Sequence, residues 1–138
     1  MFDIAQLDTR LRSENGVAMP ILHPRSGAPL LDDKGAPVTI TLLGPNSPAL
    51  KSVVRTLQLR RAEMANRGVK MIEADYDRER FDTLMGVTIG WSFDTVDGKP
   101  FLFSTENARS FWQDGRWEWV VAQAYSYCQA DGNYLPSL

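Results

Sequence analysis

The sequence predicts an α+β fold in which a small N-terminal antiparallel β-hairpin or meander is followed by about four α-helices. Two patterns predict this class. Residues 16–44 hold two β-prone runs separated by turn-forming Pro, Gly and Asp residues. Residues 47–134 place apolar side chains three and four positions apart, the spacing of amphipathic helices. The length of 138 residues suits one domain with its own core, so we expect a single domain over 1–138.

Residues 1–15 favour either a short helix or a loose, flexible arm. Ile4, Leu7 and Leu11 have helical spacing. A segment this short and terminal is only marginally stable as a helix by itself. Both alternatives therefore remain open for this part of the chain.

The two β-prone runs are 17–22 and 38–42. In the second run apolar side chains alternate with threonines, which is the period of a half-buried strand. Pro20 and Pro37 offer no N–H group to a neighbouring strand. We therefore expect these strands to lie at a sheet edge or to begin at the prolines.

The sequence Gly44–Pro48 predicts a helix start, with Ser47 as the N-cap and a proline in the first turn. The helix is expected to end near Gly68. Five apolar side chains are expected to be buried along it: Leu50, Val53, Val54, Leu57 and Met64. Its other face is basic: Lys51, Arg55, Arg60, Arg61 and Arg67.

A second helix is predicted from Glu73 to about Ser92. Gly86 and Gly90 each destabilise such a helix by about 1 kcal/mol relative to alanine. We therefore expect another backbone to approach closely at these two glycines.

The last third of the chain, from Gly90 to Tyr134, contains all four tryptophans. The Asp97-Gly98 pair predicts a turn within a short hairpin. Ser104 is the expected N-cap of a short helix, which Gly115 separates from a last helix over about 116–129. Aromatic side chains this dense either build a small core or present an adhesive face to a partner.

Candidate partner-binding residues come from two of these helices. The last helix has an apolar stripe that is expected to be core: Trp117, Val120, Val121, Ala124 and Cys128. Trp119 and Tyr127 lie off that stripe, so with Trp112 they are the candidate aromatic anchors. The candidate basic residues are Arg55, Arg60 and Arg61 of the first long helix.

No set of side chains is suited to catalysis. His23 is the only histidine, and Cys128 lies on an apolar stripe. Carboxylates of the second helix alternate with arginines, which is typical of a solvated face rather than a metal or acid–base site: Asp75, Asp77, Glu79 and Asp82. We therefore expect an interaction protein that is not an enzyme and uses no cofactor and no metal.

Charge and composition limit the partners and the cellular compartment that we expect for the protein. The formal net charge of -2 gives no overall attraction to nucleic acid or to acidic membranes. The apolar runs are too short to span a bilayer, and no secretory signal opens the chain. A single cysteine fits a reducing cytoplasm. The basic face of the first long helix is the only feature that suggests nucleic-acid binding. Because the next helix is rich in acidic residues, a solvated face or an interface with an acidic protein partner is favoured instead.

Short motifs follow one another through most of residues 20–134. In the C-terminal third they are Gly90-Trp91, 97–100 (Asp-Gly-Lys-Pro), 103–108, Phe111-Trp112 and 131–134 (Asp-Gly-Asn-Tyr). Upstream they are 27–30, 33–38 and 44–47 before the basic helix. In these motifs, and in length, the chain resembles the tail assembly chaperones of long-tailed bacteriophages and prophages.

The resemblance implies a specific role. Such proteins are made in the cytoplasm of the bacterial host and are absent from the finished virion. They bind the long helical tape measure protein, keep it soluble, and help tail tube subunits polymerise around it. The resemblance transfers no catalytic residue. Many copies along one client would require self-association, so we expect a homo-oligomer, with the edge-like N-terminal strands as its candidate contact.

Two other functions stay open at this stage. One is a structural tail or neck component, which would remain in the particle. The other is a small nucleic-acid-binding regulator that uses the basic helix. Virion composition distinguishes the first from a chaperone, and salt-dependent retention on DNA or heparin tests the second.

Overall fold

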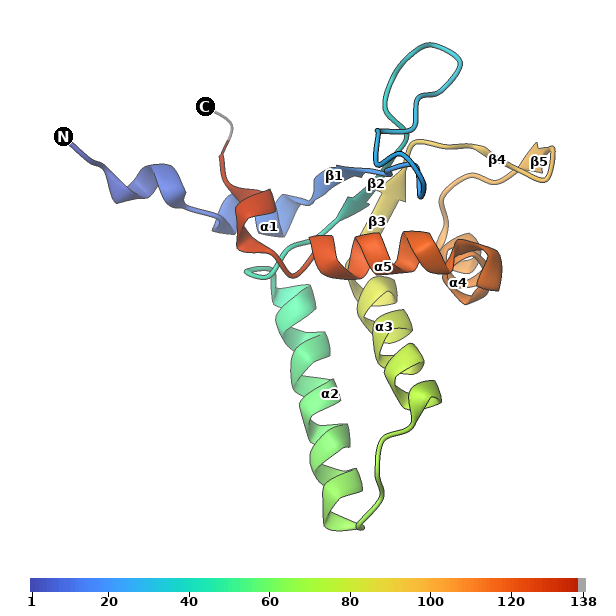
Figure 1. Ribbon diagram of the computed structural model, residues 1–138. Coiled ribbons are helices and arrows are strands. Elements are labelled where there is room, and N and C mark those ends of the chain that lie inside the picture. Colours follow the sequence, from blue (N-terminus) through green and yellow to red (C-terminus); the bar gives the residue numbers. More distant parts are fainter. Residues whose placement is uncertain (137–138) are drawn as a thin grey trace.

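The computed structural model describes residues 1–136 and confirms the α+β class. A three-stranded antiparallel sheet and a two-stranded hairpin combine with five α-helices (Figure 1). The helices are α1 Arg10–Asn15, α2 Pro48–Asn66, α3 Glu73–Val87, α4 Thr105–Gln113 and α5 Glu118–Tyr127. Short 3-10 turns are η1 Ile4–Leu7, η2 Gly115–Trp117 and η3 Asp131–Tyr134. The strands are β1 Val17–Pro20, β2 Thr39–Leu42, β3 Thr88–Trp91, β4 Thr95–Val96 and β5 Lys99–Pro100.

The three-stranded sheet has the order β1-β2-β3. Strands β1 and β2 form the predicted N-terminal pair, with Met19 opposite Ile40. Both of these side chains are buried, as is Leu42, because alternate residues of each strand turn toward the core. As expected from Pro20, β1 is an edge strand that ends at this residue.

The second long helix ends earlier than the sequence predicts. It stops at Val87, and the chain continues as β3, which pairs with β2. Thr88 ends the helix by donating its hydroxyl to the Leu84 carbonyl at 2.6 Å. The β-branched Thr88 and Ile89, followed by Gly90, are poor helix formers, so pairing with β2 prevails over extension to Ser92.

The two glycines of this segment have different surroundings. A Cβ at Gly86 would lie 2.5 Å from Cγ2 of Val53 on α2, so the close approach there comes from a side chain rather than from another backbone. A Cβ at Gly90 would meet nothing within 4 Å. Gly90 lies in β3 opposite Thr41, so the backbone beside it is that of a paired strand and not one packed against a helix.

Helices α2 and α3 form an antiparallel helical hairpin that projects away from the sheet and the remaining helices (Figure 1). Ser47 caps α2 as predicted, accepting a hydrogen bond from the Leu50 N–H at 3.2 Å. Leu50 and Leu57 are buried. Val54 is 42% exposed, so its predicted burial is wrong, because α3 covers only one side of α2.

The C-terminal aromatic residues pack mainly against one another. Trp91 stacks on Phe93 with ring centroids 4.7 Å apart and on Phe101 at 5.5 Å. Its indole N–H donates to the Phe101 carbonyl at 3.2 Å. These contacts hold the predicted hairpin β4–β5, whose turn residues Asp97 and Gly98 have φ of 55° and 75°, as a type I′ turn requires.

The segment η3 returns the chain to the start of the fold. Tyr134 is fully buried and donates its hydroxyl to the carbonyls of Leu42 at 3.2 Å and Leu43 at 3.3 Å. The buried Ser13 accepts the Asn46 N–H at 3.2 Å. The end of the predicted arm is thus anchored in the core, while none of the residues of η1 is buried.

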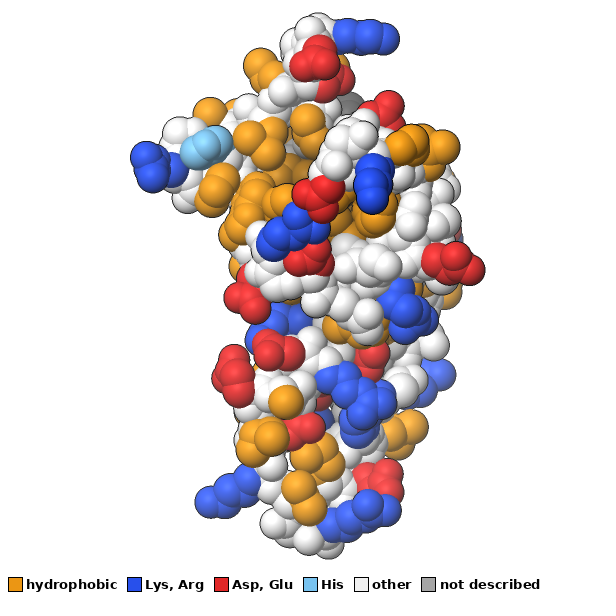
Figure 2. Space-filling model, turned by 90° about the vertical axis from the view of Figure 1, so that its right-hand side faces the viewer, with side chains coloured by type: hydrophobic (Ala, Val, Ile, Leu, Met, Phe, Trp, Pro, Cys, Tyr) orange, Lys and Arg blue, Asp and Glu red, His pale blue; other side chains and the backbone are white. Residues whose placement is uncertain are grey.

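Buried side chains from β1, β2, α2, α3, α4 and α5 form one hydrophobic cluster. Figure 2 shows hydrophobic side chains gathered over the upper body and charged ones interspersed over the helical hairpin below. Within residues 1–136, no helix is both long and apolar enough to cross a membrane.

Candidate protein-binding surfaces

Trp112 lies in the core, which corrects its interpretation as a surface anchor. It is 5% exposed and its indole N–H donates to Oγ1 of Thr88 at 3.2 Å. Its ring packs edge-on against Phe111 at 5.0 Å. Because α4 directs both aromatic residues and Ala108 inward, Trp112 supports the fold and offers a partner only a small part of its surface.

Trp119 and Tyr127 are half-buried on α5. Trp119 packs edge-on against Trp117 with centroids 6.5 Å apart, and Tyr127 against Tyr134 at 6.0 Å. Partial burial raises the pKa of the Tyr127 hydroxyl above its ordinary value of 10. Each ring keeps an accessible edge that a partner can contact.

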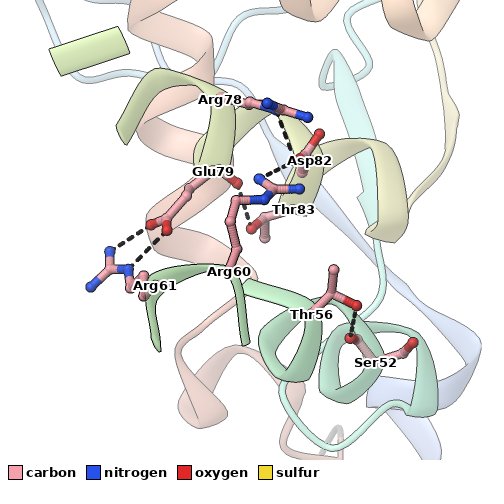
Figure 3. Close-up of polar contacts among 8 residues, drawn as sticks. All are labelled: Ser52, Thr56, Arg60, Arg61, Arg78, Glu79, Asp82 and Thr83. Carbon is pink, nitrogen blue, oxygen red and sulfur yellow. Dashed lines mark hydrogen bonds and ion pairs between the residues drawn. The ribbon is translucent and has the colours of Figure 1, made fainter. Parts of the chain in front are cut away.

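Arg61 is engaged within the helical hairpin rather than free for a partner. Its Nε donates to Oε2 of Glu79 at 2.8 Å and its Nη2 to Oε1 at 2.5 Å (Figure 3). Glu79 is 4% exposed, so the prediction of a solvated acidic face is wrong at this residue. The Arg61 hydrogen bonds hold the pKa of the Glu79 carboxyl below its usual value despite burial.

Arg60 makes a second ion pair between the two helices, with Asp82 at 3.0 Å (Figure 3). Arg78 approaches the same carboxylate at 3.9 Å from the preceding turn of α3. The sequence carried a signal for these pairs. Two arginines side by side on one helix match two carboxylates three residues apart on the next, but only the antiparallel packing of α2 and α3 brings them together.

Arg55 remains on the outer side of α2. It is exposed, as is Lys51 one turn earlier. Neither residue forms an ion pair with any residue in 1–136. Of the three predicted basic residues, Arg55 is thus the one whose charge is available to a partner.

Exposed apolar side chains gather on two projecting parts of the molecule. The helical hairpin carries Val54, Leu59, Val69, Ile72 and Tyr76, which are 41% to 68% exposed. The N-terminal segment carries Met1, Phe2, Ile4, Leu7 and Leu11, all more than half exposed. Large apolar side chains concentrated on projecting elements are typical of surfaces that contact another protein.

The outer edge of the sheet is obstructed at the end of β1. Pro20 has no N–H group. Beyond it, the side-chain amide of Gln123 on α5 accepts the Leu22 N–H and donates to the Leu22 carbonyl, both at 2.9 Å. Gln123 thereby takes the place that a neighbouring strand would occupy, an arrangement that the sequence pattern does not reveal.

Cys128 and His23, the side chains considered as catalytic candidates, make contacts that support the fold. Cys128 is fully buried, and burial raises the pKa of its thiol to about 12. His23 accepts backbone N–H groups of Arg25 at 3.1 Å and Ser26 at 3.3 Å through Nδ1, as a turn residue does. In the part of the chain that the structure describes, no group of three His, Cys, Asp or Glu side chains is placed to hold a metal ion.

Comparison of the chain with protein-family models, with curated proteins and with solved structures finds no match.

Proposed function

We propose that this protein is a tail assembly chaperone of a long-tailed bacteriophage or prophage. It binds the tape measure protein, keeps it soluble and promotes assembly of the tail tube around it. The protein acts in the cytoplasm of the bacterial host, outside the finished virion, as a binding protein without catalytic activity or cofactor. Support comes from the resemblance of the motifs between residues 20 and 134.

The observation that carries the proposal is the exposed apolar surface of the projecting helical hairpin. Leu59 and Ile72 are 68% and 64% exposed. A chaperone for a long amphipathic helix must offer apolar contacts from an element that the client can reach along its length. The ion pairs of Arg60 and Arg61 join the two helices that carry this surface.

Self-association belongs to the same proposal, because one client would hold many copies. Pro20, and Gln123 beside Leu22, obstruct strand pairing at the end of β1. The exposed N-terminal segment is the better candidate, since Phe2 and Ile4 are each 74% exposed. Exposed apolar arms commonly contribute to contacts between subunits.

The test is co-expression of the protein with the tape measure protein of its own phage, followed by pull-down from the soluble fraction. We expect the tape measure protein to become soluble and to co-purify. Leu59→Glu combined with Ile72→Glu should abolish co-purification without unfolding the protein, because both side chains are exposed. Glu63→Gln, a surface change on α2, is the matched control. A tape measure protein that stays insoluble and unbound overturns the proposal.

Purified virions distinguish the chaperone from a structural tail or neck component. Mass spectrometry should find the protein absent from particles, and stoichiometric presence would favour the structural role. A nucleic-acid-binding role has less support, because acidic partners already engage Arg60 and Arg61. Retention on heparin that depends on Lys51 and Arg55 would favour it.

A further inference from the structure

A cleft of about 900 Å³ opens where α3 meets α4, η2 and α5. Its apolar part is formed by Phe81 of α3, Trp112 of α4, and the α5 residues Val121, Ala122 and Tyr125. These come from three helices and lie at the junction between the helical hairpin and the body (Figure 1). The cleft is separate from the exposed apolar side chains at Leu59 and Ile72, neither of which lines it.

The rim of the cleft is acidic. Its charged residues are Glu73, Asp77, Asp114 and Glu118, against Arg78 and Arg80. Arg80 serves two of the carboxylates, lying against Asp77 and 3.7 Å from Glu73. Arg78 turns to Asp82 on the flank shown in Figure 3.

Glu118 has the least compensated charge on this rim. Asp114 is held by Arg116 at 2.7 Å, whereas Glu118 has no ion pair with any residue in 1–136. The cleft therefore combines an apolar floor with a surplus of negative charge. A helix with one apolar face and flanking cations is complementary to both features.

We propose that this cleft binds a basic amphipathic helix of a partner protein. The floor receives the apolar face of that helix, and Glu118 with the Glu73–Asp77 pair attracts lysines or arginines beside it. This inference rests on the proposed function in one respect, that the client is helical. It adds that the docking segment of the client is basic and that it binds in this cleft.

Exposed helices of this chain fit the cleft poorly, so a second copy is not its occupant. The exposed face of α2 is basic at Lys51 and Arg55. Its exposed large apolar side chains, Val54 and Leu59, are five residues apart and so do not form one continuous apolar stripe. The segment η1 has exposed Ile4 and Leu7 but lies between aspartates, Asp3 and Asp8, which the acidic rim would repel. A continuous apolar face beside cations has to come from another protein.

The test uses the full chain and three synthetic peptides of about five helical turns. One has a leucine face flanked by lysines, the second replaces the lysines by glutamates, and the third scrambles the first so that the leucine face is lost. Isothermal titration calorimetry measures each affinity at low and at physiological salt. We expect the basic amphipathic peptide to bind at least about tenfold tighter than the other two, and more weakly as salt rises.

Two variants locate the site. Ala122→Arg covers the floor with a long charged side chain and should weaken the basic peptide by about tenfold or more. Glu118→Lys should weaken it by about two- to fivefold, as a rim charge does. Ala62→Arg is the control, because Ala62 is also exposed but lies on α2 outside the cleft. Circular dichroism confirms that all three variants are folded.

Three results would overturn the inference: equal affinity for the acidic or scrambled peptide, no effect of Ala122→Arg, or self-association that Ala122→Arg abolishes. The last would place a second copy in the cleft. If the complex with the tape measure protein survives Ala122→Arg, the cleft is not the binding site, but the proposed function still stands. If the basic peptide binds specifically but no complex with the tape measure protein forms, the cleft inference stands and the proposed function is overturned.

Discussion

Arg61 of α2 and Glu79 of α3 are joined by two parallel hydrogen bonds across the helical hairpin, at 2.8 and 2.5 Å. Only 6% of the Glu79 side chain is exposed, against 51% for Arg61. The carboxylate has therefore lost most of its water and depends on the guanidinium for compensation. A bidentate pair of this kind is stronger and more directional than a surface ion pair, so it fixes the register of the two helices.

Replacing Glu79 by glutamine should lower the free energy of unfolding by about 1–3 kcal/mol, because a buried charged hydrogen-bond acceptor becomes a neutral amide. Urea denaturation at pH 7 measures the change. The matched control is Glu63→Gln, which removes an exposed pair with Arg67 on α2 and should cost less than about 1 kcal/mol. An equal decrease in the free energy of unfolding for both variants would show that the buried pair stabilises the fold no more than an exposed pair does.

The same pair predicts how stability depends on pH. Arg61 keeps the pKa of Glu79 in the folded protein below its ordinary value of 4.5. The resulting stabilisation is present above that value and is lost as the pH falls through the lower, folded pKa. Arg116 lowers the pKa of Asp97 and of Asp114 in the same direction.

Denaturation of wild type and Glu79→Gln at a series of pH values isolates the Glu79 contribution. The difference between the two should be largest near pH 7 and should shrink as the pH falls below about 4.5. Asp97 and Asp114 are present in both proteins and so cancel. A difference that stays constant down to pH 3 contradicts the assigned pKa shift.

Position 44, in the connection between β2 and α2, has no room for a side chain. A Cβ there would lie 2.7 Å from Cδ1 and Cε1 of Tyr134 and would overlap the Ser13 hydroxyl. The ring and the buried serine have little room to retreat, so Gly44→Ala should destabilise the protein by about 3 kcal/mol. Thermal denaturation checks this. Gly115→Ala is the control, because a Cβ at that glycine would meet nothing within 4 Å.

Truncation of the two termini should affect the stability of the protein to very different extents. Removing residues 1–8 takes away no buried side chain and should leave the melting temperature nearly unchanged. Ending the chain at residue 130 removes the fully buried Tyr134, whose loss alone costs about 3–5 kcal/mol. Differential scanning calorimetry of both truncations tests the pair. A large loss from the N-terminal truncation that does not depend on protein concentration would show that the arm packs on the body, because lost subunit contacts would make it concentration-dependent.

Local sequence signals predicted much of the fold because they act over a few residues. Ser47 and Ser104 cap the helices assigned to them, and Asp97-Gly98 forms the expected turn. The conversion of 88–91 into a strand depends instead on β2, which lies far away in the sequence. Propensity alone does not show that a partner strand is available.

The candidate binding residues illustrate the same limit. Spacing placed Trp119 and Tyr127 off the apolar stripe, where the structure also leaves them half-buried. Spacing did not show that α4 turns Trp112 inward or that Glu79 lies opposite Arg61. Those outcomes depend on how helices pack, which no single helix encodes.

Trp112 and Trp119 should separate stability from partner binding. Trp112→Ala empties a core position and should cost about 3–5 kcal/mol, leaving a weakly stable protein. Trp119→Ala removes a half-buried ring and should cost less than about 2 kcal/mol, so the fold persists. Co-purification with the tape measure protein should nevertheless decrease, because an accessible tryptophan edge contributes strongly to interfaces. Chemical denaturation and pull-down of each variant measure the two effects. Unfolding of Trp119→Ala, or a folded variant with undiminished binding, would assign Trp119 to the core alone.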